Sequence, residues 1–170
     1  KTSQIPGFVT SQISSIGTDD IVALTSAQSA ALTIEQIQAF STQQIAAFET
    51  SDVAILQLLQ VQALSSDQLR AFSTADVAAL RTTTVAGLSA AQLPGLGTDD
   101  IIALTSAQVA ALSATQLGAL SSAQLLAFDT ADIASFSTTQ LSGLTTAQIV
   151  VLETGDFAAM KTAQIAALSS

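Results

Sequence analysis

The sequence contains no cysteine, histidine, tyrosine or tryptophan, and only 4 of its 170 residues are lysine or arginine. Without cysteine there are no disulfides and no thiolate chemistry. Without histidine and cysteine the chain also lacks the commonest acid–base catalysts and metal ligands. Phosphate binding needs clustered cations, so a net charge of -9 argues against a nucleic-acid partner and against an anionic membrane surface.

Long apolar runs are missing as well. No stretch approaches the ~18 consecutive apolar residues of a transmembrane helix. The chain is nevertheless 49% hydrophobic, with only 4% aromatic and 10% charged residues. We therefore expect a core of aliphatic side chains and a surface made mainly of serine, threonine and glutamine.

An eight-residue repeat accounts for this composition. Counted from Lys1, the 170 residues divide into 21 units and two further residues. Position 8 is Leu, Phe, Ile or Met in every unit, and position 5 is Ile, Leu or Val except at Ser29 and Phe157. Position 4 is Gln or Asp except at Thr84, and positions 1 and 2 are mainly Ser and Thr. Such self-similarity at a fixed period indicates a repeat architecture.

The spacing within each unit predicts a helix. Apolar residues three apart fit helical rather than alternating periodicity, and Ser or Thr followed three residues later by Gln is a capping-box pattern. One continuous helix is excluded, because eight residues turn the apolar stripe by about 80° per unit. A β-solenoid is the alternative, but Ala-Ala and Gln are poor strand residues. We predict an all-α solenoid of two-turn helices, one per octapeptide.

Aspartate sets a second period. Aspartate occupies position 4 at spacings of 32, 24, 24, 32 and 24 residues, so this pattern repeats after 80. Lys1, Arg81 and Lys161 are also 80 apart. We expect about 3.3 helices per superhelical turn, and a rod on the order of 60 Å long if helices stack 9–10 Å apart. The aspartates are Asp20, Asp52, Asp76, Asp100, Asp132 and Asp156.

Each of these aspartates has Thr two residues before it, at position 2. We expect the N-cap to move to this threonine, which places the carboxylate in the first turn, where it favours the helix dipole. Gly17 and Gly97 are then expected at the ends of the preceding helices. The pairs Asp19/Asp20 and Asp99/Asp100 could attract Ca²⁺, but no surrounding loop supplies the six to eight oxygens that this ion needs. We predict no metal, cofactor or catalytic residue.

Three units depart from the pattern. Pro6-Gly7 and Pro94-Gly95 lie inside predicted helices, where proline removes a hydrogen bond, so we expect distorted helices there. The unit 57–64 lacks a Ser or Thr cap and carries Leu58 and Leu59. These leucines are expected either to pack on a neighbouring turn or to form a contact patch for a partner.

Units such as Thr25-Ser26-Ala27-Gln28-Ser29-Ala30-Ala31-Leu32 resemble the T-x-x-Q-[ILV]-x-A-L arrays of very large bacterial repeat proteins. The resemblance implies a secreted or surface-exposed, adhesin-like protein in which the repeats form a stalk or spacer. The serines have no base to activate them, so an enzyme is disfavoured.

We expect residues 1–170 to form one solenoid, a piece of a longer array. Super-repeats span 1–80 and 81–160, and a third begins at 161–170. The predicted function is a non-enzymatic extracellular or cell-surface spacer whose main partners are the neighbouring repeats. The alternative is a binding module that uses its repetitive surface for a glycan, a protein or ice.

Overall fold

The computed structural model describes residues 1–168, and this part of the chain contains helices and no strands. There are nineteen α-helices, α1–α19, in this part of the chain. Two further units contain a 3-10 helix, η1 or η2, in place of an α-helix. The elements are η1 (Thr2–Gly7), α1 (Thr10–Ile13), α2 (Thr18–Val22), α3 (Ser26–Ser29), α4 (Ile34–Ala39), α5 (Thr42–Ile45), α6 (Thr50–Val53), α7 (Leu58–Gln62), α8 (Ser66–Leu69), α9 (Thr74–Ala79), α10 (Thr82–Ala86), η2 (Leu93–Gly95), α11 (Thr98–Ala103), α12 (Ser106–Ala111), α13 (Ala114–Ala119), α14 (Ser122–Leu125), α15 (Thr130–Ser135), α16 (Thr138–Leu141), α17 (Thr146–Val151), α18 (Thr154–Ala159) and α19 (Thr162–Ala167).

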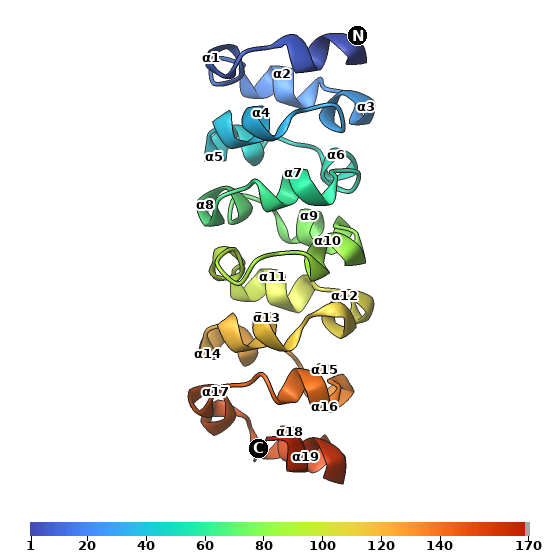
Figure 1. The fold of residues 1–170 in the computed structure, drawn as a ribbon, viewed down its shortest axis with the longest axis vertical. Coiled ribbons are helices and arrows are strands. Elements are labelled where there is room, and N and C mark those ends of the chain that lie inside the picture. The colour runs from blue at the N-terminus through green and yellow to red at the C-terminus, as the bar shows by residue number, and fades with distance from the viewer. Residues whose placement is uncertain (169–170) are drawn as a thin grey trace.

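The helices wind into an elongated column with the two ends of the chain at opposite ends (Figure 1). Each helix packs on the one three units further along the chain, as α1 does on α4, α2 on α5 and α16 on α19. A helix of one turn is unstable in water by itself, so this stacking between turns is what stabilises each unit. The predicted all-α solenoid with one helix per octapeptide is confirmed.

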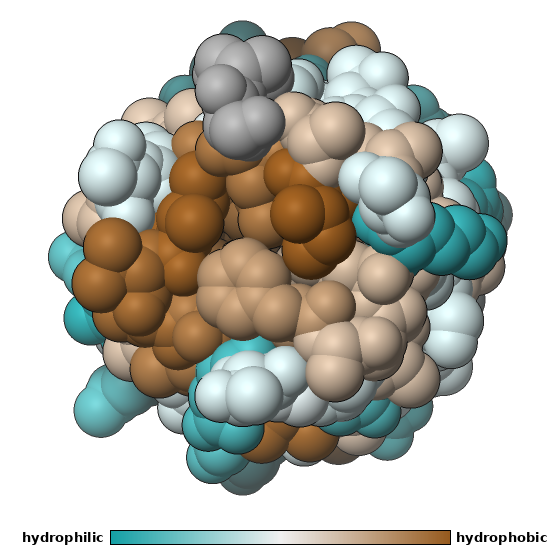
Figure 2. Space-filling model, turned by 90° about the horizontal axis from the view of Figure 1, so that it is seen from below, coloured by the Kyte–Doolittle hydropathy of each residue, from teal (hydrophilic) through white to brown (hydrophobic). Residues whose placement is uncertain are grey.

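The core lies along the axis of the column and is built from positions 5 and 8 of the units. Side chains at these positions are buried almost throughout, from Ile5 to Met160. Seen from the C-terminal end, apolar side chains occupy much of the middle and most hydrophilic ones lie around the rim (Figure 2). Phenylalanines at position 8 of consecutive units meet edge to face, with ring centroids 5.4 Å apart in the pair Phe40 and Phe48.

The helices are shorter than predicted. They span 4 to 6 residues, for example α5 and α4, which is about one to one and a half turns instead of two. The helix stops before position 8, whose side chain packs in the core. Leu104 has an extended backbone at φ -60° and ψ 133°. In the unit of Phe48, the Phe48 N–H donates to the carbonyl of Ile45, three residues earlier, at 3.2 Å.

The predicted shift of the N-cap in the aspartate units is wrong. Position 1 remains the N-cap in these units, and Thr at position 2 is the first helical residue, as Thr98 is in α11. Gly17 and Gly97 are therefore the N-caps of α2 and α11 in extended conformation, not the ends of the preceding helices. In three of these units, those of Asp76, Asp100 and Asp156, the aspartate accepts the N-cap N–H, as glutamine does in the other units.

The two units that contain proline are distorted, as predicted. Pro6 lies in the 3-10 helix η1, and Pro94 lies in η2, which has only three residues. The proposed start of a third super-repeat at 161–170 is helical over α19, and Ser169 and Ser170 lie outside the described residues.

Candidate functional site

The position 4 glutamine first completes the cap of its own helix. In α13, the N–H of Ser113 donates to Oε1 of Gln116 at 2.8 Å, and the N–H of Gln116 donates to the Ser113 hydroxyl oxygen at 3.2 Å. The first of these bonds survives where the N-cap has no hydroxyl, for example from the N–H of Val9 to Gln12 and from that of Gln57 to Gln60. The capping box that the sequence predicts is thus present, and its glutamine half is the more general one.

The same glutamine also connects successive turns of the coil, a role that no local sequence pattern indicates. From Gln36 to Gln148 its Nε2 donates to two backbone carbonyls, at positions 5 and 8 of the unit four places earlier, and Gln164 reaches positions 6 and 8. Gln116 Nε2 reaches the carbonyl oxygens of Val85 and Leu88 at 2.9 Å each. The glutamines with inter-turn bonds are Gln36, Gln44, Gln60, Gln68, Gln92, Gln108, Gln116, Gln124, Gln140, Gln148 and Gln164.

These bonds satisfy groups that a short helix leaves open. The last carbonyls of a helix have no intrahelical partner and are costly to bury without one. The glutamines supply that partner from inside the column, where Gln116 is 3% exposed. Because helices pack on the unit three places along and glutamines reach four places back, a turn contains between three and four units, a range that includes the predicted 3.3.

Aspartate units connect the turns differently. In three of them, those of Asp52, Asp76 and Asp156, the carboxylate accepts from a hydroxyl three units earlier instead of donating four units back. The Thr50 hydroxyl donates to Asp76 at 2.6 Å, and the Thr130 hydroxyl donates to Asp156 at 2.9 Å. Thr50 and Thr130, both at position 2, thus serve a helix of the next turn and not their own caps.

Ser29, the polar exception at position 5, belongs to the same arrangement. Its side chain is fully buried, and its hydroxyl donates to Oδ2 of Asp52 at 3.1 Å, while the Ser26 hydroxyl donates to Oδ1 at 2.7 Å. A serine in the core position is therefore paired with a carboxylate that is itself 1% exposed. Two hydroxyls satisfy this buried charge.

Two other aspartates are less well satisfied. Burial raises the pKa of Asp100, although a hydrogen bond from the Gly97 N–H at 2.8 Å opposes this shift. Burial and the nearby charge of Asp129 raise the pKa of Asp132, and a hydrogen bond from the Asp129 backbone opposes it. Asp129 is the N-cap of α15 and accepts from the Asp132 N–H at 2.7 Å, so two carboxylates share one helix start.

The paired carboxylates do not converge on a common point. Asp99 is exposed, whereas Asp100 is buried, and both Asp19 and Asp20 are exposed. Within residues 1–168 no group of three or more His, Cys, Asp or Glu residues is arranged to hold a metal ion. No helix of this part of the chain is long and apolar enough to cross a membrane.

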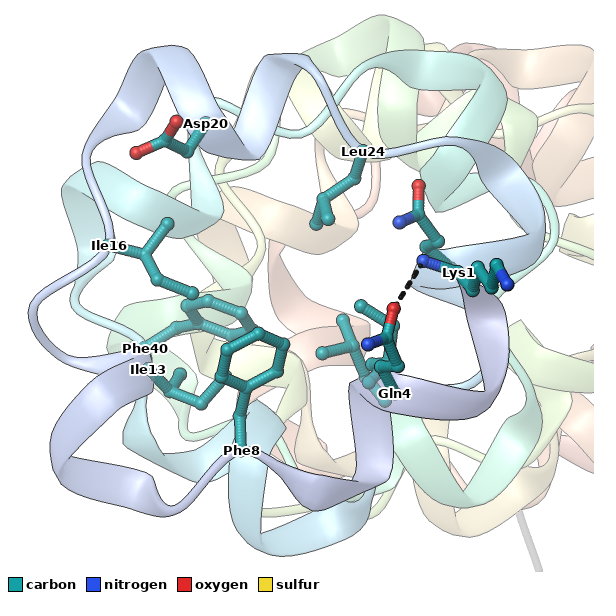
Figure 3. A pocket seen from close by; sticks show the side chains of 11 residues that line it. Lys1, Gln4, Phe8, Ile13, Ile16, Asp20, Leu24 and Phe40 are labelled. Carbon is teal, nitrogen blue, oxygen red and sulfur yellow. Dashed lines mark hydrogen bonds between the residues drawn. The ribbon is translucent and has the colours of Figure 1, made fainter.

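A pocket of about 350 Å³ opens at the N-terminal end of the column (Figure 3). Its walls are core positions such as Ile13 and Leu24, together with position 4 side chains such as Gln4 and Asp20. The backbone nitrogen of Lys1 donates to Gln4 Oε1 at 3.0 Å. Apart from Lys1, the lining residues occupy the positions that form the core and the inter-turn bonds elsewhere, so the pocket continues the axial core.

Leu58 and Leu59 lie in different environments. Leu58 packs against Gly87 in the next turn, where a side chain larger than hydrogen would collide with its methyl groups. Leu59 is 61% exposed and lines a shallow groove of about 360 Å³ with Ile34 and Glu35. The expectation of packing on a neighbouring turn holds for Leu58 only.

A row of exposed aliphatic side chains follows one face of the C-terminal half. Ile102, Leu126 and Val150 occupy position 6 of the units that contain α11, α14 and α17, and their exposed fractions are 66%, 47% and 78%. These three helices stack on one another, so the residues recur every 24 positions along the same side of the column. Most other units have a small residue here.

Comparison with known proteins agrees with this geometry. The family model described as ALTTAQ repeat matches residues 13–50, 45–82, 70–106, 95–130 and 149–170. No curated protein and no solved structure is significantly similar to the chain. The matches cover most of the sequence and support a structural repeat module built from octapeptides; the chain belongs to the ALTTAQ repeat family.

Proposed function

We propose that residues 1–170 are a non-enzymatic spacer or stalk segment in a large extracellular bacterial protein. The observation that supports this most directly is the regularity of the inter-turn bonds. From Gln36 to Gln148, the amide reaches carbonyls 31 and 28 residues earlier wherever glutamine stands at position 4. Each unit therefore meets its predecessors in the same way, and the rod can lengthen by whole units without a new interface.

A structural role also suits the chemistry of the polar residues. Buried carboxylates such as Asp52 and Asp76 accept hydrogen bonds from hydroxyls, and none faces a histidine or cysteine because the chain has neither. Serine at position 1, as in Ser113, receives a hydrogen bond from its own helix. These groups hold the fold together, and this use leaves no activated nucleophile.

The competing hypothesis of a repetitive binding surface has weaker support. Binding to ice or a glycan through hydroxyls needs an ordered outward-facing array of them. Many position 1 hydroxyls instead face the backbone, as in Ser41 and Thr145, and those of Thr50 and Thr130 are bonded to aspartates. The spacer hypothesis requires no such free surface.

Solution scattering tests the spacer function. A variant in which residues 81–160 occur twice adds ten units, or about three turns, so its longest dimension should increase by roughly 30 Å at an unchanged cross-section. An inserted flexible linker of 80 Gly and Ser residues serves as the control and should give a broad distribution of lengths. An unchanged longest dimension with a larger cross-section would contradict the proposal.

The extracellular location needs its own measurement. Antibodies against residues 1–170 should bind intact cells of the source organism as well as permeabilised ones. Binding only after permeabilisation would place the spacer inside the cell.

A further inference from the structure

The inter-turn hydrogen bonds are unevenly distributed along the column. Each glutamine reaches four units back, so the bonds that cross a given boundary come from the four units that follow it. After the boundary between residues 72 and 73, these units carry Asp76, Thr84, Gln92 and Asp100 at position 4. Every other run of four consecutive units from Thr33 to Leu168 contains at least two glutamines there. We call this boundary the central junction.

The one glutamine at the central junction lies in an irregular unit. Gln92 donates to the carbonyl oxygens of Val61 and Leu64 at 2.9 Å each, but the helix that follows it is η2, which contains Pro94. The neighbouring units add no such bond. Thr84 is buried and has no amide, and Asp100 accepts from the Gly97 N–H within its own helix.

Backbone carbonyls near the central junction therefore have no glutamine Nε2 as a hydrogen-bond donor from the units before and after that of Gln92. For Thr84 the corresponding carbonyls are those of Val53 and Leu56, and for Asp100 they are those of Leu69 and Phe72, by the offsets of 31 and 28 residues seen elsewhere. The free energy gained from capping these helix ends is missing here.

Side chains on the outside of the column bridge the central junction instead. Gln62 Nε2 donates to the Gly87 carbonyl at 2.6 Å, the Ser66 hydroxyl to the Ala91 carbonyl at 2.8 Å, and an Arg70 guanidinium nitrogen to the Pro94 carbonyl at 3.2 Å. All three bonds are exposed, so water competes for both partners and reduces what each contributes. The partly buried bond from Thr50 to Asp76 is the exception.

We propose that the central junction is a built-in break point at which the coil separates first, leaving residues 1–72 and 73–168 as two shorter coils. The opening follows from the missing inter-turn bonds alone. Its use, as the place where a stalk lengthens under tension before its halves unfold, rests on the proposed spacer function. Repeat arrays open locally in this way because each unit contacts only its neighbours along the coil.

Hydrogen exchange measured by mass spectrometry on residues 1–170 at pH 7 tests the break point. Backbone amides in residues 53–100 should exchange at least about tenfold faster than those in residues 105–152, since local opening exposes them. The double variant Thr84→Gln, Asp100→Gln supplies two of the three missing amides and should slow exchange in 53–100 by about tenfold without changing 105–152.

The matched control is Thr83→Gln, Asp99→Gln, which makes the same chemical changes one residue away, at exposed positions. It should leave the exchange profile as it is. Uniform protection along the wild-type column, or equal slowing by both double variants, would overturn the break point. Because the wild-type profile is decisive by itself, misfolding of a variant does not rescue the proposal. A uniform profile from a rod-shaped protein rejects the break point alone, whereas a compact shape in scattering rejects the spacer.

Discussion

Gln116 binds the backbone of Val85, 31 residues earlier in the chain, through its Nε2, which lies 2.9 Å from the Val85 carbonyl oxygen. The Oε1 of the same side chain accepts the Ser113 N–H at 2.8 Å. One side chain thus starts its own helix and closes the end of another in the preceding turn. This double role needs both a donor and an acceptor on one side chain of this length, which explains why position 4 is so often glutamine and never glutamate.

Gln116→Glu should destabilise the protein, because a carboxylate keeps the cap of its own helix but turns an acceptor toward the carbonyls of Val85 and Leu88. We expect a loss of about 2–4 kcal/mol in the free energy of unfolding at pH 7, measured by urea denaturation. The loss should shrink as the pH falls toward the unfolded glutamate pKa of about 4.3 and be smallest below it, because a protonated carboxyl can donate one bond.

Gln43→Glu is the matched control for this change, since Gln43 is exposed at position 3. It should change stability by no more than about 0.5 kcal/mol. Equal losses from the two substitutions would mean that added negative charge matters and that the inter-turn bond does not.

The two kinds of aspartate unit should respond in opposite ways to glutamine. Asp52→Gln removes the acceptors of the Ser26 and Ser29 hydroxyls and forces a longer side chain into a fully packed place, so we expect a loss of about 1–3 kcal/mol. Asp100→Gln removes a partly desolvated charge and adds donors toward Leu69 and Phe72, so the melting temperature should rise. Thermal unfolding followed by circular dichroism compares the two variants. Melting temperatures that shift in the same direction in both would contradict the division of the aspartates into two kinds.

Much of this fold can be predicted from the sequence because the period is short and repeats many times. Apolar positions 5 and 8, the capping box and the distortion at the two prolines all follow from local patterns. The inter-turn bonds could not be predicted in the same way, because nothing near Gln116 in the sequence marks Val85 as its partner. The number of units per turn decides that pairing, and the aspartate spacing was its only trace.

The predicted position of the N-cap in the aspartate units is wrong for a related reason. A threonine hydroxyl can accept a cap hydrogen bond and glycine has no side chain to do so, so a local rule places the cap at Thr98 instead of Gly97. The structure keeps Gly97 because the cap is made by the Asp100 carboxylate and because the next turn needs a hydroxyl at position 2 in related units such as that of Thr50. Packing between turns overrides the local preference.

Asp132→Asn should stabilise the protein at neutral pH. The folded state raises the pKa of Asp132, so it binds the proton more readily than the unfolded chain does. The wild type therefore becomes less stable as pH rises from the unfolded pKa of about 3.9 through the raised folded value. Melting temperatures should be higher for the variant at pH 7 and should converge with the wild type below about pH 3.5.

Asp67→Asn is the control for this pH dependence, because Asp67 is an exposed first-turn residue of α8 without a second carboxylate at the same helix start. The variant should lose a little stability at pH 7, as expected when a favourable dipole interaction is removed. A gain from Asp67→Asn as large as that from Asp132→Asn would show that net charge, and not the pair with Asp129, is responsible.

The close approach of α13 and α16 gives a prediction about backbone packing. A Cβ atom on Gly143 would collide with the backbone of Ala114, including its carbonyl oxygen, which a rotamer change cannot relieve. Gly143→Ala should therefore push the two turns apart and lower stability by about 1–3 kcal/mol. Gly155→Ala is the matched substitution, because a Cβ at Gly155 would meet only an ordinary van der Waals contact. Alanine is also the better helix former, so this variant should gain up to ~1 kcal/mol in the free energy of unfolding. Urea unfolding of both variants measures these changes. An unchanged or higher free energy of unfolding in Gly143→Ala would show that the two turns can move apart without cost, and the close contact would then not be needed for stability.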